Sequence, residues 1–246
     1  MSPFEISGVI FICIFGSALL GMWLRGVLPE RHLDAETKDL VKVGVGLIGT
    51  MAALLLGLLV ASAKNSFDAR GSELTQVAAN TILLDRALAH YGPETNEVRG
   101  ILKVAVGRAI DQFWSKQSGV DARTNREIIF DMIQALVPHS DVQRALQAQA
   151  ESIAINLAQT RWLLFAQSGT AISTPFLVVV VFWLSVLFVS FGLFAPRNGT
   201  AIATLLVSAI SVAGALFLIL ELDHPFSGLI QVSSAPLRNA LLVLGK

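Results

Sequence analysis

The residues best suited to chemistry form a short acidic group that follows an apolar stretch. Glu221, Asp223 and His224 lie within four consecutive positions. Carboxylates at the edge of a membrane would suit a hard cation such as Ca²⁺, which takes about six to eight oxygen ligands. Two carboxylates and an imidazole fall short of that number, and Pro225 fits the ordinary end of a helix. Both interpretations stay open: Glu221 and Asp223 are candidate ion contacts, and we predict no metal site.

A second motif, G-x-G-x-x-G, runs from Gly44 to Gly49. A dinucleotide site needs a strand before this motif and a polar cleft around it. Here the motif lies inside a long apolar run, so we interpret it as small residues for close helix packing. The packing stripe continues at helical spacing and consists of Gly46, Thr50, Ala53, Gly57 and Ala61.

No other combination of residues predicts catalysis. His32, His90 and His139 are scattered and form no H-E-x-x-H motif. The single cysteine, Cys13, cannot form a disulfide or a thiolate metal site by itself. No G-x-S-x-G motif and no Walker loop occurs. We therefore expect no enzyme activity and no cofactor. The 18 basic and 18 acidic residues cancel, which leaves no basic field to attract nucleic acid.

The segments that must position these residues are strongly apolar. Hydrophobic residues make up 54% of the chain and charged residues 15%, whereas an ordinary soluble domain has about 25% charged residues. Since about 20 apolar residues cross a bilayer as a helix, we predict an all-α integral membrane protein with four uncharged spans. Their approximate bounds are 6–24, 43–63, 176–195 and 201–220.

The predicted spans form two pairs around a polar insert with helical patterns. The second pair is a tight hairpin that turns at Asn198-Gly199-Thr200. No proline or strong turn separates the second span from the first insert helix, so we predict one continuous helix from Val43 to His90. The predicted regions are 1–63 for the first pair, 64–175 for the helical insert, 176–222 for the second pair and 223–246 for a short tail.

The spans contain no ionisable residue, whereas coupled transporters usually place one at mid-depth. One bundle of four apolar helices offers no wet route, so a conduction path would have to lie between subunits and be lined by apolar or small side chains. The second span is the best candidate for this lining because it continues into the polar insert. Plain packing of the same face against neighbouring helices remains equally open. The candidate pore-lining residues are Met51, Leu54, Leu58 and Ser62.

Several segments spread along the chain form a recognisable set of motifs. They are Gly57–Arg70, Leu83–Arg86, His90–Glu94 and Leu222–Gly228, with the continuation Ser233–Leu237. On these motifs the chain resembles the bacterial bestrophin-like domain family, and the resemblance covers nearly the whole chain. Asn65-Ser66-Phe67-Asp68 is also similar to the segment that follows the second span in bestrophins proper.

The resemblance implies a homopentameric ion channel with a hydrophobic neck lined by the second span. It also implies a bacterial inner-membrane protein with cytoplasmic termini and insert, whose partners are the lipid bilayer, sister subunits and permeant ions. Of the acidic run that binds Ca²⁺ in bestrophins, only Glu221 and Asp223 remain here, so calcium gating is not expected. The alternative is a non-conducting membrane scaffold or sensor whose helical insert binds a partner.

Overall fold

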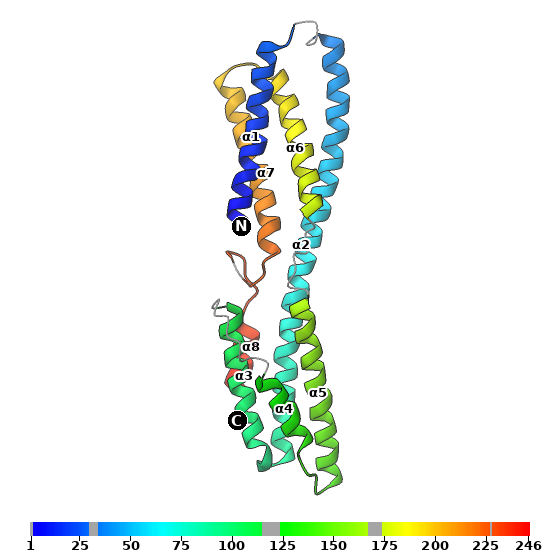
Figure 1. Cartoon of the computed structure of the whole chain (residues 1–246), viewed down its shortest axis with the longest axis vertical. Coiled ribbons are helices and arrows are strands. Elements are labelled where there is room, and N and C mark those ends of the chain that lie inside the picture. Colours follow the sequence, from blue (N-terminus) through cyan, green and yellow to red (C-terminus); the bar gives the residue numbers. More distant parts are fainter. Residues whose placement is uncertain (1, 30–33, 115–123, 167–173, 227) are drawn as a thin grey trace. The chain divides into compact units, whose positions relative to one another are not determined.

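The computed structural model describes residues 2–29, 34–114, 124–166, 174–226 and 228–246 (Figure 1). These ranges fold into α-helices and one short 3-10 helix, without a strand, so the predicted all-α fold is confirmed. The chain divides into two compact units. Unit 1 comprises Met1–Ser66 and Thr170–His224, and unit 2 comprises Phe67–Gly169 and Pro225–Lys246.

Unit 1 is built from four long apolar helices, each long and apolar enough to cross a membrane. Asn198 begins the last of them, because its side-chain oxygen accepts a hydrogen bond from the Ala201 N–H at 2.8 Å. Asn198 is therefore the N-cap of this helix, and Gly199 and Thr200, which we predicted in the turn, are the first residues of the helix. The helices are α1 (Pro3–Val27), α2 (Ala35–Tyr91, of which the first part belongs to unit 1), α6 (Thr174–Phe194) and α7 (Gly199–Leu222).

Helix α1 packs closely on α6 and also contacts α7. A Cβ atom at Gly21 would collide with the backbone carbonyl of Val189, and one at Gly192 would collide with the carbonyl of Ala18. Reciprocal glycines therefore let the two backbones touch, which is a common way to associate apolar helices in lipid. The core around this contact has no exposed area at Ile14, Ala18, Val180, Ala209 and Leu216.

Helix α2 is unbroken, so the predicted continuous helix is confirmed. It begins at Ala35 rather than at Val43, because Asp34 precedes it and accepts a hydrogen bond from the Thr37 N–H at 2.8 Å. It ends at Tyr91, where Gly92 takes a φ of 143° and Pro93 follows. Only glycine adopts that backbone conformation readily, so Gly92-Pro93 ends the helix one residue after the predicted end at His90.

Unit 2 buries the apolar face that recurs along the second part of α2. Leu74, Leu84 and Leu88 are each 1% exposed, and Ile133 is fully buried. Ser140 caps the helix that begins at Asp141, because its hydroxyl accepts a hydrogen bond from the Gln143 N–H at 3.1 Å. The sequence Thr124-Asn125-Arg126-Glu127 has the pattern of a capping box, but its side chains, like His32, lie outside the described residues. Besides α2, the elements are η2 (Pro93–Thr95), α3 (Asn96–Trp114), α4 (Thr124–Gln134), α5 (Asp141–Ala166) and α8 (Ala235–Val243).

Candidate pore-lining helix and polar clusters

The first part of α2 has one face that packs within unit 1. Ala52, Leu59 and Ala63 are at most 6% exposed and belong to the unit's core. A Cβ atom at Gly49 would lie 3.8 Å from Leu187 Cδ2 of α6, which is ordinary van der Waals contact. These positions recur at helical spacing and so lie on one side of α2.

The opposite side of α2 carries all four candidate pore-lining residues. Met51 is 45% exposed, Leu54 76% and Leu58 64%, and Ser62 is also exposed. The four positions share one face at the spacing of three and four residues that a helix requires. The side chains proposed for a pore therefore lie outside the core of unit 1, and their role stays a prediction.

The small-residue stripe of α2 differs from our expectation. Its members are exposed, and a Cβ atom at Gly46 or Gly57 would meet nothing within 4 Å. The predicted close packing is therefore not made within the chain. Sequence alone could not reveal this, since every span contains small residues and only tertiary structure selects the pairs that meet. The close approach occurs instead between Gly21 and Gly192. The stripe comprises Gly46, Thr50, Ala53, Gly57 and Ala61.

Helix α2 is the least covered of the four apolar helices. Only 11% of its most apolar window is buried, compared with 33% for α1 and 28% for both α6 and α7. Its exposed side is apolar, because Val43, Leu47, Leu54 and Leu58 are each more than 60% exposed. A wide apolar face of this kind has to be covered by lipid or by another protein surface.

The candidate ion contacts lie at the end of α7. Glu221 is 3% and Asp223 5% exposed, so neither carboxylate projects from the surface. His224 closes the helix end, with its Nδ1 3.0 Å from the carbonyl oxygen of Leu220. No group of three or more His, Cys, Asp or Glu side chains in the described ranges is placed to hold a metal ion. A role for Glu221 and Asp223 in ion passage stays a prediction.

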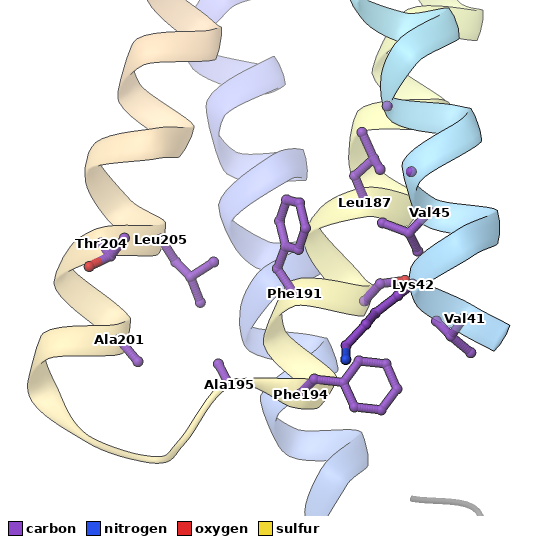
Figure 2. A pocket seen from close by; sticks show the side chains of 13 residues that line it. Val41, Lys42, Val45, Leu187, Phe191, Phe194, Ala195, Ala201, Thr204 and Leu205 are labelled. Atoms are coloured by element: carbon purple, nitrogen blue, oxygen red, sulfur yellow. The ribbon is translucent and has the colours of Figure 1, made fainter. Parts of the chain in front are cut away.

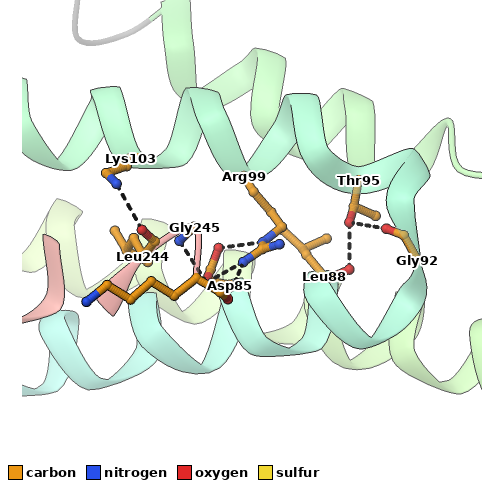
Figure 3. Close-up of polar contacts among 9 residues, drawn as sticks. Asp85, Leu88, Gly92, Thr95, Arg99, Lys103, Leu244 and Gly245 are labelled. Atoms are coloured by element: carbon orange, nitrogen blue, oxygen red, sulfur yellow. Dashed lines mark hydrogen bonds and ion pairs between the residues drawn. The ribbon is translucent and has the colours of Figure 1, made fainter. Parts of the chain in front are cut away.

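A polar cluster in unit 2 was not predicted (Figure 3). Asp85, 1% exposed, accepts two hydrogen bonds from Arg99, at 2.8 and 3.1 Å. This interaction raises the pKa of Arg99 above its ordinary value. The signal was available in the sequence, because Asp85 interrupts an otherwise apolar helix face beside Leu84 and Leu88. A buried carboxylate at such a position needs a cationic partner.

The same cluster holds the end of the tail. Arg99 also donates to the Lys246 carbonyl at 3.1 Å, and Lys103 donates to the Leu244 carbonyl at 3.1 Å. The Gly245 N–H donates in turn to Asp85 Oδ2 at 3.3 Å. Asp85 of α2 and Arg99 and Lys103 of α3 therefore bind one backbone group in each of the three residues after α8, and we call this arrangement the tail clamp.

Unit 1 also contains a groove of about 650 Å³ between α2, α6 and α7 (Figure 2). Its wall is mostly apolar, and Lys42 lies at one end, close to Phe194. The ammonium group of Lys38 lies 5.9 Å from the ring centroid of the same phenylalanine. The lining residues are Val41, Lys42, Val45, Gly46, Gly49, Leu187, Ser190, Phe191, Phe194, Ala195, Ala201, Thr204 and Leu205.

These observations describe an all-helical membrane protein whose second long helix keeps an apolar face uncovered. The sequence profile of the Bestrophin-like domain matches residues 12–237. The chain therefore belongs to the Bestrophin-like domain family, as its motifs predicted.

A solved structure shares the fold. It is the crystal structure of a bacterial Bestrophin homolog from Klebsiella pneumoniae that carries a point mutation, and it aligns with a TM-score of 0.66 at 13% sequence identity. The alignment covers 95% of this chain and 99% of that one. At this identity the match establishes the fold alone. No protein of curated function matches the sequence.

Proposed function

We propose that the protein is a homopentameric ion channel in which the exposed face of α2 lines a hydrophobic neck. One observation carries the proposal: Leu54 and Leu58 are 76% and 64% exposed in a helix apolar enough to span a membrane. Membership of the Bestrophin-like domain family supports it. We further propose a bacterial inner membrane as its location, with cytoplasmic termini and insert, and no enzymatic activity.

The physical argument concerns where water can enter. The core of unit 1 is filled by apolar side chains, with Ile14, Val180 and Leu216 fully buried, so the described helices of this unit enclose no hydrophilic path among themselves. A permeation path then has to follow an axis shared by several copies. A ring of leucines around such an axis would gate conduction by excluding water.

The test is ion flux into liposomes that contain the purified protein. Leu54→Ala should widen the neck and raise the flux, because truncation removes much of the apolar side chain. Val207→Ala is a matched control, since Val207 is 62% exposed on α7, away from the proposed lining. Absence of flux under every ion gradient contradicts the channel, and an equal response of both variants places the constriction elsewhere.

A non-conducting scaffold or sensor is the second candidate. The observation that favours it lies on α5, where Val142, Ile155, Trp162 and Leu163 are between 46% and 69% exposed. Exposed apolar side chains on an insert helix would serve a cytosolic partner as well as a sister subunit. An oligomer whose central axis is closed by side chains along its whole length would favour this candidate.

A further inference from the structure

We propose that the groove between α2, α6 and α7 binds one phospholipid, with an acyl chain along the groove and the phosphate at Lys42. The proposal concerns a site between three helices of unit 1 and does not depend on ion conduction. It rests on the shape and lining of the groove, on the position of its cations and on the glycines that form part of its wall (Figure 2).

The lining fits a hydrocarbon chain. The hydroxyls of Ser190 and Thr204 already donate to the carbonyls of Val186 and Thr200, at 3.0 and 2.9 Å. These two hydroxyls are therefore already hydrogen-bonded, and apart from Lys42 the rest of the wall consists of aliphatic and phenyl groups. On α2 the wall extends from Val41 to Gly49, which is about 12 Å at 1.5 Å per residue. An elongated apolar groove of this length suits an acyl chain better than a compact polar solute.

The glycines of α2 open this space. A Cβ atom at Gly46 would meet nothing within 4 Å, and one at Gly49 would only reach van der Waals contact with Leu187. Larger residues at these two positions would fill part of the groove. Gly46 and Gly49 of the G-x-G-x-x-G motif would therefore leave room for a lipid chain, rather than bind a dinucleotide or pack tightly against another helix of the chain.

Positive charge collects at the end of the groove. Lys42 lines it, and Lys38 lies over the Phe194 ring. Arg25 donates to the Ala195 carbonyl, and Arg197 donates to the Met22 carbonyl at 3.0 Å, so both guanidinium groups are fixed at the same end of the helices. Basic groups between membrane helices are well suited to lipid phosphates.

The Asp39 carboxylate competes for this charge. Asp39 accepts a hydrogen bond from Lys42 at 2.9 Å, and the two side chains are 73% and 61% exposed. This pairing lowers the pKa of Asp39 below its ordinary value. The Lys42 ammonium has three donors and Asp39 uses one of them, so two remain for a phosphate.

The experiment is native mass spectrometry of the delipidated protein, titrated with phosphatidylglycerol. We expect saturation at one lipid per subunit. Gly46→Leu should abolish this binding by filling the groove, and Ala201→Leu should do the same from α7. Gly44→Leu is the matched control, because Gly44 lies on the same helix, has open space around it and does not line the groove.

The role of the phosphate is tested separately. Lys42→Gln should lower the affinity for phosphatidylglycerol about fivefold, as expected for the loss of one cation near the membrane surface. The affinity for uncharged diacylglycerol should not change. Equal binding by the Gly46→Leu and Gly44→Leu variants would overturn the proposal. A second result would also overturn it: the wild type binds no lipid, and Gly46→Leu dissociates the oligomer. A second copy of the chain would then occupy the groove.

Discussion

At the residue scale, the contact between α1 and α6 depends on the absence of two side chains. Gly21→Ala would push a methyl group into the Val189 carbonyl, and neither backbone can move without disturbing the core. We expect a loss of about 1–3 kcal/mol, as is typical of overpacking. Thermal unfolding in detergent should show a lower Tm.

The control for this prediction lies on the same helix. Gly16→Ala adds the same methyl group where nothing lies within 4 Å, so its Tm should equal or exceed that of the wild type. If both variants unfold at the same temperature, the backbones do not meet at Gly21.

A buried hydroxyl gives a second prediction at this scale. Tyr91 is 4% exposed, and its hydroxyl has no hydrogen-bond partner among the described residues. Burial raises the pKa of Tyr91 above its ordinary 10.0, and the charge of Glu94 adds to this rise. Because the folded state favours the neutral phenol, its stability is fully present below pH 10.0 and falls as the pH rises above that value.

Tyr91→Phe removes both the unsatisfied hydroxyl and its ionisation. At neutral pH the Tm should stay unchanged or rise slightly, because no hydrogen bond is lost. Above pH 10 the variant should lose less stability than the wild type, as measured by unfolding at a series of pH values. A clear loss of stability at pH 7 would show that the hydroxyl has a partner.

At the scale of the elements, the tail clamp fixes the segment that follows α8. Arg99→Met would leave the Asp85 carboxylate buried without its main cationic partner, since the side chains of Asp85 and Arg99 are only 2% and 13% exposed. Breaking a buried pair in this way costs about 3–5 kcal/mol. We expect a lower Tm and faster proteolysis near residue 244.

An exposed pair provides the comparison for the tail clamp. Arg144 lies 2.7 Å from Asp141, but these side chains are 68% and 95% exposed. Arg144→Met should therefore cost less than about 1 kcal/mol. The double variant Asp85→Leu with Arg99→Met should recover part of the stability lost in the single variant. If it recovers nothing, the cost comes from the lost contacts to the tail.

The helices themselves could be predicted from sequence because their signals are local. Leu74, Leu84 and Leu88 recur at helical spacing and are buried on one face of α2, and Gly92-Pro93 is a helix stop signal at the point where α2 ends. The partners of each face could not be predicted in the same way. The contact between the helices of Gly21 and Gly192 and the binding of Asp85 to Arg99 and the tail each join residues that are far apart in the chain. Nothing in the local pattern distinguishes the exposed Gly57 from the buried Gly21.

At the scale of the whole molecule, the uncovered face of α2 has to meet lipid or further copies of the chain. The structure of one subunit does not distinguish lipid from a neighbouring subunit on this face, because hydrocarbon and a protein core attract leucine about equally. The distinction can be made chemically, since Cys13 is the only cysteine and can be replaced. With Cys13→Ser as the background, Leu54→Cys would place one thiol on this face in each subunit.

If α2 surrounds a common axis, thiols at position 54 of neighbouring copies lie close together. A short bis-maleimide should then produce a ladder of linked species in the membrane, whose upper limit is the number of subunits. Phe182→Cys in the same background is the control, because Phe182 is 63% exposed on α6 and faces lipid if the axis lies at α2. A ladder from position 182 and monomer alone from position 54 would reverse the assignment, since α6 would then face the axis and the leucines of α2 would be lipid contacts.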